Sequence, residues 1–224
     1  MKRLIALLAV VWLTASGCSL LGYFFPAEED DTDAFLAWDG MEKYEEGDYR
    51  GARVAFEKIR DWYPYSQYAM LAELKVADSH YKLGEYEEAI FAYEEFENLH
   101  PRNEAIPYVI YQTGMCYYAQ IDTPDRDQDK ARRARDTFAR LIATFPDSEY
   151  AVKAREQLNR TLKTLAESEF SIGMYYYKSR HYRAALHRFR AVIEKYPDMG
   201  VHQKALEYIA LTEDRLSENA VFPE

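Results

Sequence analysis

Small, aromatic and proline positions recur along this 224-residue chain in a fixed order and at a fixed spacing. Two successive stretches share seven such positions, and every matched pair lies 37 residues apart. The first set is Gly40, Tyr44, Gly47, Tyr49, Ala52, Phe56 and Pro64, and the second is Ala77, Tyr81, Gly84, Tyr86, Ala89, Tyr93 and Pro101. Each stretch predicts two helices, because the central glycine can end the first helix in a left-handed conformation and the proline stops the second.

Two further copies of this pattern follow with longer spacings. The third copy has eight extra residues between its halves, and we expect a loop at residues 121–128. The fourth copy follows a spacer that is fourteen residues longer. The third comprises Gly114, Tyr118, Ala134, Phe138 and Pro146, and the fourth comprises Gly173, Tyr177, Tyr182, Ala185, Phe189 and Pro197. Residues 148–178 contain no proline and one glycine, so they predict either one very long helix or two helices with a tight break.

The small residue in each first helix predicts close packing of the two helices in a pair. The aromatic residues of the second helices are expected to fill the space between pairs; they are Phe56, Tyr93, Phe138 and Phe189. The order of small residue, alanine, aromatic and proline resembles the tetratricopeptide (TPR) repeat, a helix pair that stacks into a right-handed superhelix. The resemblance implies an all-α, TPR-like helical-hairpin solenoid with about five repeats and nine to ten helices.

The N-terminal residues have the composition of an export signal. Two basic residues precede an almost unbroken apolar run over residues 4–13, and Ala-Ser-Gly at 15–17 supplies the small residues that a signal peptidase requires. The run is shorter than the roughly 20 residues that a membrane-spanning helix needs. Cys18 follows directly, and the whole resembles the lipobox of bacterial lipoproteins, in which the thiol is acylated. Ser19 resembles lipoproteins that are sorted to the outer membrane. The alternative is an ordinary signal peptide with an incidental cysteine.

These patterns give the predicted organisation of the chain. A lipoprotein signal peptide is expected at 1–17, a lipidated N terminus with an acidic tether at 18–31, and the solenoid at 32–216. The predicted solenoid segments are about 32–66, 67–103, 104–147 and 148–198, with a capping helix at 199–216 and a short tail at 217–224. The last helix is expected to cap the array because a terminal repeat needs a polar outer face.

The charge of the chain excludes one class of partner. The formal net charge is −10, and it becomes −12 when the two basic residues of the signal are removed. Nucleic-acid binding needs a basic face, so no nucleic acid is expected as a partner. The charge is uneven, because residues 28–46 hold nine acids and one lysine whereas residues 126–163 hold ten bases and six acids. The uneven charge indicates two different binding partners at the two ends of the chain, or charged helix faces that are exposed to solvent.

No arrangement of residues in the sequence indicates catalysis. The five histidines do not form a zinc-binding spacing, and no nucleophile elbow, phosphate-binding loop or dinucleotide fingerprint is present. His80 is predicted to be a satisfied core histidine. Cys116 lies in an apolar helical pattern and is predicted to be a buried small hydrophobe. We therefore predict no catalytic residue, no metal ligand and no cofactor.

Tyrosines near the end of each first helix predict an aromatic row. In TPR superhelices the first helices line the concave face, so such a row can line a groove for an extended or helical peptide. Packing between repeats is the alternative. The predicted groove residues are Tyr44, Tyr81, Tyr118 and Tyr177, together with Met41 and Leu74.

Several local segments are typical of one lipoprotein family. They are Arg-Asp-Trp-Tyr-Pro-Tyr-Ser-Gln-Tyr at 60–68, Tyr-Gln-Thr-Gly at 111–114, Asp-Arg-Asp at 125–127 leading to Ala-Arg at 131–132, Phe-Pro-Asp-Ser-Glu-Tyr at 145–150 and Tyr-Pro-Asp at 196–198. With the lipobox and the repeats, these segments resemble the BamD family, the TPR lipoproteins of the outer-membrane β-barrel assembly (BAM) complex. The resemblance covers residues 18 to about 216.

The resemblance implies a non-enzymatic scaffold on the periplasmic face of the cell outer membrane, anchored through Cys18. Its expected partners are the periplasmic domains of a BamA-like, barrel-forming subunit, unfolded outer-membrane proteins and companion Bam lipoproteins. The C-terminal units are expected to dock the barrel-forming subunit through a basic stretch that comprises Arg126, Arg132, Arg133, Arg140, Lys153 and Arg155. Two alternatives share the anchor and the repeats. One is a pilotin-like lipoprotein for secretin or pilus assembly, and the other is a lipoprotein that binds the cell wall.

Overall fold

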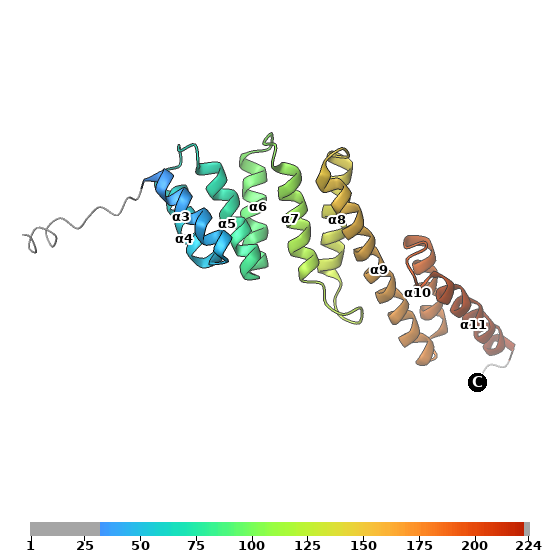
Figure 1. The fold of residues 1–224 in the computed structure, drawn as a ribbon. Coiled ribbons are helices and arrows are strands. Elements are labelled where there is room, and N and C mark those ends of the chain that lie inside the picture. Colours follow the sequence, from blue (N-terminus) through green and yellow to red (C-terminus); the bar gives the residue numbers. More distant parts are fainter. Residues whose placement is uncertain (1–31, 222–224) are drawn as a thin grey trace, which may run out of the picture. The chain divides into compact units, whose positions relative to one another are not determined.

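The computed structural model describes residues 32–221. Within this range the chain forms nine α-helices and no strands (Figure 1). They are α3 (Asp33–Glu46), α4 (Tyr49–Trp62), α5 (Ala69–Leu83), α6 (Tyr86–Leu99), α7 (Ile106–Ala119), α8 (Asp129–Thr144), α9 (Glu149–Lys178), α10 (Tyr182–Lys195) and α11 (His202–Val221). The first eight form four consecutive pairs that coincide with the four copies of the sequence pattern. None of these nine helices has the length and apolar character needed to cross a bilayer.

The chain separates into two compact units within α5, between Ala72 and Glu73. The first unit contains the α3–α4 pair. The side chain of Thr32 caps α3 by accepting a hydrogen bond from the backbone N–H of Phe35 at 3.2 Å. The turn between the helices follows the prediction, because Gly47 has a φ of +87° and the carboxylate of Asp48 accepts a hydrogen bond from the N–H of Gly51 at 3.0 Å. These signals act between residues close in the sequence, so the hairpin ends and its turn are encoded locally.

Each aromatic residue of the second helices packs on the small residue of its own pair. A Cβ atom added to Gly40 would lie 2.9 Å from Cζ of Phe56. In the second unit, a Cβ added to Gly114 or Gly173 would lie 2.5 Å from the ring of Phe138 or Phe189. These contacts lie inside the pairs, which the prediction did not include. The ring of Phe189 also lies 5.5 Å from that of Tyr208 on α11, so this ring packs between successive elements as predicted. At these glycines the absence of a side chain on the first helix creates room for the ring inside the pair.

The connections between the paired helices differ along the second unit. The α5–α6 turn uses Gly84 with a φ of +77°, as predicted. The α9–α10 turn places Arg180 in the same left-handed region, with a φ of +60°. The α7–α8 connection is instead the predicted inserted loop, which occupies residues 120–128.

A buried carboxylate joins three helices of the second unit. Asp78 on α5 is only 2% exposed, and its Oδ1 accepts hydrogen bonds from the hydroxyls of Tyr93 on α6 and Tyr108 on α7, at 2.7 and 2.6 Å. Its Oδ2 accepts from Nζ of Lys75 at 2.9 Å. Burial, and then the neighbouring Asp78, raise the pKa of Tyr93 well above its ordinary value. Because every group has a partner, this network fixes how the three helices pack.

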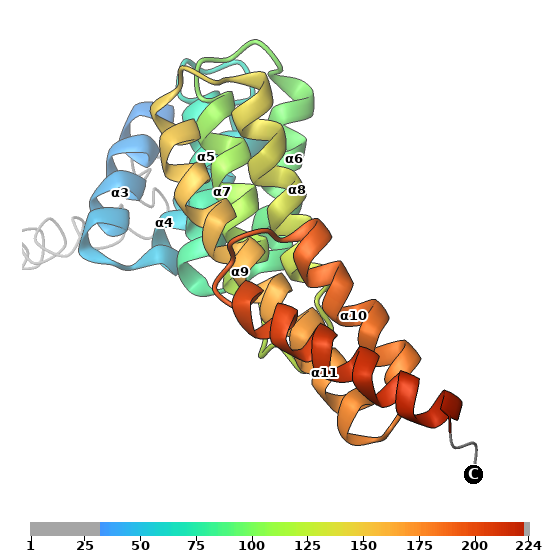
Figure 2. The ribbon, with the colours of Figure 1, turned by 90° about the vertical axis from the view of Figure 1, so that its right-hand side faces the viewer.

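Residues 149–178 form a single helix, which decides between the two forms predicted for this stretch. The hydroxyl of Ser148 caps α9 by accepting from the N–H of Tyr150 at 3.2 Å. The helix has 30 residues and is therefore about 45 Å long. It contacts α7 and α8 as well as α10 (Figure 2). One rigid element thus belongs to two successive helix pairs.

The last helix packs on α10 and is longer than predicted. Ala205 and Thr212 are fully buried on its inner face, whereas Leu206 and Glu207 on the other side are exposed. The expected end at residue 216 is wrong, because α11 continues to Val221. The sequence between these positions contains neither glycine nor proline, and nothing there stops a helix.

Candidate partner-docking site

The inserted loop between α7 and α8 is tied down by its own hydrogen bonds. Gln128 is only 6% exposed, and its Nε2 donates to the carbonyl oxygens of Thr123 and Arg126 at 2.9 and 3.0 Å. The N–H of Arg126 donates to the carbonyl of Thr123 at 3.0 Å. A hydrogen bond from the Thr123 side chain holds the pKa of the exposed Asp125 below its ordinary value. The loop therefore has a defined shape, although it is an insertion in the repeat.

A cavity of about 330 Å³ lies beside this loop, against α8, α9 and α10. Its walls carry five cationic side chains and two anionic ones. The lining residues are Arg126, Asp127, Gln128, Arg132, Arg135, Leu165, Ser168, Glu169, Ile172, Arg188, Lys195 and Tyr196. We call it the basic pocket. Although the whole chain is acidic, this concave surface favours an anion.

Ion pairs within the basic pocket leave an excess of positive charge. Nη1 of Arg188 lies 2.9 Å from Oε2 of Glu169, and Nη2 of Arg132 lies 3.3 Å from Oδ1 of Asp127. Arg135 pairs with Asp136, and this hydrogen bond raises the pKa of Arg135. Burial raises the pKa of Tyr196, and Arg135 opposes that shift. The tyrosine hydroxyl therefore stays protonated at neutral pH and is available as a donor.

One buried acceptor in the basic pocket has no partner among the residues that the structure describes. It is Oε1 of Gln128, whose amide orientation is fixed because Nε2 faces two carbonyl oxygens. A buried polar atom without a partner is costly, and a hydrogen-bond donor on a bound partner removes that cost. The basic pocket can thus accept a carboxylate together with a neighbouring N–H or O–H group.

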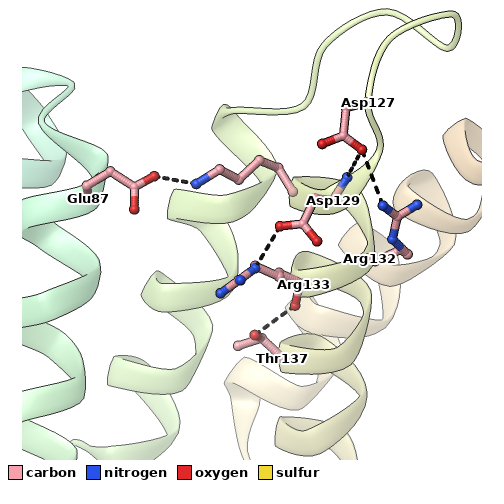
Figure 3. Close-up of polar contacts among 7 residues, drawn as sticks. Glu87, Asp127, Asp129, Arg132, Arg133 and Thr137 are labelled. Atoms are coloured by element: carbon pink, nitrogen blue, oxygen red, sulfur yellow. Dashed lines mark hydrogen bonds and ion pairs between the residues drawn. The ribbon is translucent and has the colours of Figure 1, made fainter.

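Only part of the predicted docking set lies at the basic pocket. Arg126 and Arg132 line it. Arg133 does not, because its guanidinium lies 5.8 Å from the ring centroid of Tyr117 on α7 and pairs with Asp129 at 2.8 Å (Figure 3). Lys130 does not line the pocket either, and its ammonium group pairs with Glu87 on α6.

The remaining predicted docking residues make local contacts elsewhere in the second unit. Arg140 forms two hydrogen bonds with Glu97 on α6, at 2.5 and 3.1 Å. Nζ of Lys153 lies 4.6 Å from the ring centroid of Tyr150, and Arg155 donates to the carbonyl of Pro146 at 3.3 Å. The sequence reasoning missed Arg135, Arg188 and Lys195. Their spacing is informative, because Arg135 lies one turn after Arg132 and Lys195 lies two turns after Arg188.

Three tyrosines of the predicted row contact a tyrosine on the second helix of their own hairpin. The rings of Tyr44 and Tyr49, Tyr81 and Tyr86, and Tyr177 and Tyr182 lie edge to face, with centroids 5.2, 5.8 and 5.6 Å apart. Tyr177 also contacts Tyr208 of α11, at 5.3 Å. Each of the four predicted tyrosines is partly buried, as are Met41 and Leu74. This packing accounts for part of the aromatic surface, and the use of the rest as a peptide groove stays a prediction.

Tyr118 lines a second cavity, to which the inserted loop also contributes residues. This cavity measures about 290 Å³. Its lining residues are Tyr118, Ile121, Asp122, Pro124, Thr164 and Glu167. The loop therefore contributes residues to two cavities of different charge.

Two predicted structural residues have the expected surroundings. Cys116 is fully buried, and burial raises the pKa of its thiol to about 12. Nδ1 of His80 lies 2.7 Å from Oε2 of Glu85, so this histidine has a partner at the α5–α6 turn. Cys18, the predicted site of lipidation, lies outside the described residues, as do the predicted signal peptide and the tether.

Comparisons with known proteins identify the family. A family model with the description "Outer membrane lipoprotein" (YfiO) matches residues 29–223. The outer membrane protein assembly factor BamD of Rickettsia prowazekii (strain Madrid E) is 30% identical over 201 residues, which cover 88% of this chain and 77% of that protein. The BamD of Neisseria gonorrhoeae is 27% identical over 233 residues, which cover 96% of this chain and 85% of that protein. Among solved structures, a thermophilic TPR protein of Thermus thermophilus gives a TM-score of 0.44 at 16% identity, over 80% of this chain and 100% of that chain. From the match over residues 29–223, the chain belongs to the YfiO family of outer membrane lipoproteins.

Proposed function

We propose that this protein is a scaffold of outer-membrane protein assembly, and that it acts by binding rather than by catalysis. The observation that carries this proposal is the similarity of nearly the whole chain to the BamD assembly factors. The names of these relatives favour assembly over the pilotin-like and cell-wall-binding alternatives. The helix pairs supply a stable framework, and the inserted loop adds a charged concave surface to it.

The proposed position of the scaffold is the periplasmic face of the outer membrane, with acyl chains on Cys18 as its anchor. A single acyl chain gives marginal membrane binding, whereas several chains give stable attachment. The lipobox-like sequence that ends at Cys18 supports this position.

The proposed docking site for the barrel-forming subunit is the basic pocket. An acidic side chain of that subunit would lie among Arg132, Arg135 and Arg188, and a neighbouring donor would reach Oε1 of Gln128. Desolvated charge pairs of this kind determine which partner binds and how it is oriented. The tyrosine-lined surfaces of the hairpins are the proposed contact for unfolded barrel proteins.

Two adjacent arginines provide a matched test of the docking proposal. Arg132→Glu reverses a charge in the basic pocket, whereas Arg133→Glu makes the same change beside Tyr117, outside it. Arg132 pairs with Asp127 of the loop, and Arg133 pairs with Asp129 in the first turn of α8. Each substitution therefore removes one ion pair, and the two variants should lose a similar amount of folding free energy. We expect Arg132→Glu to weaken retention of the barrel-forming subunit at least about tenfold and Arg133→Glu to leave it close to the parent level.

The measurement is affinity purification through a C-terminal tag, with identification of the bound membrane proteins and a circular dichroism melt for each variant. Equal retention by the two folded variants would place docking elsewhere. Recovery of secretin or pilus components in place of a barrel-forming subunit would contradict the proposed assembly function and favour the pilotin-like alternative.

A further inference from the structure

Both tryptophans of the predicted mature chain are exposed, and both lie in the first unit. Trp38 on α3 is 59% exposed and Trp62 at the end of α4 is 57% exposed. Tryptophan is highly buried on average, so two exposed examples in one hairpin require a reason. Phe35 is 40% exposed and stacks on Trp38 with ring centroids 5.8 Å apart, and Tyr65 is fully exposed.

These aromatic side chains gather toward the end of the hairpin where the chain enters from its N terminus. The hydroxyl of Ser66 donates to Oδ2 of Asp33 at 2.6 Å, so the segment after α4 lies against the first turn of α3. Trp62 is the last residue of α4, and Tyr65 is next to Ser66. Phe35 and Trp38 lie in the first half of α3. We call these four residues the aromatic end of the first unit.

The outer face of α3 changes character along its length. Its inner face buries Leu36, Ala37 and Gly40, which places Phe35 and Trp38 on the opposite side. Further along the same outer face, Glu42 and Glu45 are exposed. The face is thus apolar near the N terminus and acidic farther from it. A helix that meets a lipid–water boundary with one end has this distribution.

The sequence that precedes the first unit places the aromatic end within reach of the bilayer. Asp33 lies fifteen residues after Cys18, and at full extension this stretch spans at most about 50 Å. Residues 20–25, Leu-Leu-Gly-Tyr-Phe-Phe, are themselves apolar and suit the interface directly below acyl chains on Cys18. The remaining residues, 26–32, span about 25 Å at most.

We propose that the aromatic end lies in the lipid–water interface of the membrane to which Cys18 is anchored, and that it holds the first unit against the bilayer. This inference rests on the proposed lipid anchor. Tryptophan and tyrosine suit this interface because each combines a large apolar ring with one polar group that stays hydrated. An unfolded client is the competing occupant of these aromatic side chains. Two observations favour the bilayer over a client as the occupant. The chain from Cys18 reaches the hairpin at this end, and the half of α3 beyond the aromatic end is acidic.

The two tryptophans themselves report on this contact. The acylated full-length mature protein is reconstituted into vesicles of phosphatidylethanolamine and phosphatidylcholine, with either ordinary or brominated acyl chains, and flotation verifies its attachment. Trp62→Phe leaves Trp38 as the only tryptophan, and Trp38→Phe leaves Trp62. The control carries both Trp→Phe changes and Phe91→Trp, because Phe91 on α6 is 69% exposed and belongs to the second unit.

We expect bromolipid to remove most of the fluorescence of Trp38 and part of that of Trp62, with a blue shift of the emission maximum on vesicle attachment. The Phe91→Trp reporter is expected to keep its fluorescence. If the protein floats with the vesicles and Trp38 is not quenched, the proposed lipid anchor is supported but the aromatic end does not touch the bilayer. This result would overturn the inference alone. Equal quenching of the Phe91→Trp reporter would mean that bromolipid quenches any exposed tryptophan of the anchored protein. The quenching would then not be specific to the aromatic end, and the inference would be overturned. A protein that does not float lacks the anchor, and the inference fails with it.

Discussion

The α5–α6 and α7–α8 pairs of the second unit share one packing plan and differ in their connection. In both, a small residue of the first helix, Ala77 or Gly114, is buried in the same core as a large ring of the second helix, Tyr93 or Phe138. Gly84 closes the first pair in a tight turn, whereas residues 120–128 form a nine-residue loop in the other. The repeat pattern therefore gives the hairpin, and the departure from it gives the basic pocket.

The comparison also explains why the insertion is tolerated. The entropic cost of closing a loop grows only slowly with its length. The packing of Phe138 on Gly114 does not depend on the connection, and Gln128 recovers hydrogen bonds for the added backbone. Substitutions in the helix pairs and in the inserted loop separate the contribution of the repeat from that of the insertion.

The largest expected effect is at the small residue of α7. Gly114→Ala places a Cβ atom 2.5 Å from the ring of Phe138, and overpacking of this kind costs about 3 kcal/mol of the free energy of unfolding. Urea denaturation measures the loss. Phe138→Leu in the same chain is expected to recover part of it, since the two positions share one space. A loss below about 0.5 kcal/mol for Gly114→Ala would mean that the pair is not close-packed.

A smaller effect is expected at the tight turn of the α5–α6 pair. Gly84 has a φ of +77°, and Gly84→Ala forces a side chain into the left-handed region at a cost of about 1–2 kcal/mol. Arg180 already occupies that region at the α9–α10 turn, with a φ of +60°. Arg180→Gly should therefore leave the stability unchanged or raise it by up to about 1 kcal/mol. Thermal denaturation of both variants tests this, and equal losses would contradict the interpretation of the turns.

Gln128→Ala tests the insertion without touching the repeat. The change removes two hydrogen bonds to loop carbonyls, and we expect a loss of about 1 kcal/mol or less, because the freed carbonyl oxygens can reach water. Hydrogen exchange of residues 121–127 should become faster while the core of the second unit keeps its protection. Retention of the barrel-forming subunit should fall in the same variant. Unchanged exchange in the loop would show that Gln128 does not organise it.

Cys116 gives an effect that appears only at high pH. The pKa of its thiol is about 12 in the folded chain, compared with an ordinary value of 9.0, because the side chain is buried. A raised folded pKa contributes stability below pH 9, and this contribution is lost as the pH rises toward 12. Relative to Cys116→Ala, the parent should lose up to ~1.4 kcal/mol per pH unit in that window. Parallel stability profiles of the two chains between pH 9 and 12 would show that the thiol is not desolvated.

Local signals made most of the fold predictable from the sequence. Gly47, Gly84 and the ring positions act through neighbours a few residues away or through one facing helix, so a matched spacing is enough to find them. The predicted end of α11 at residue 216 is wrong, because no residue near 216 stops a helix and α11 continues to Val221.

The basic pocket could not be assembled in the same way. Arg188 and Lys195 come from α10, more than 50 residues after Arg132, and they reach the pocket because α9 positions α10 beside α8. Arg132 and Arg133 are adjacent in the sequence but point to different neighbours, since successive residues of a helix are rotated by about 100°. A stretch rich in arginine shows that positive charge is present, and only the packing decides which side chains converge.

The continuity of α9 has a mechanical consequence for the second unit. Arrays of separate helix pairs can flex at each junction, like the links of a chain. Here one 30-residue helix replaces the junction between the third and fourth pairs, since it contacts α7 and α8 as well as α10. A force applied to the α10–α11 end therefore reaches α7 and α8 through one continuous helix. No flexible loop lies between the third and fourth pairs to absorb it.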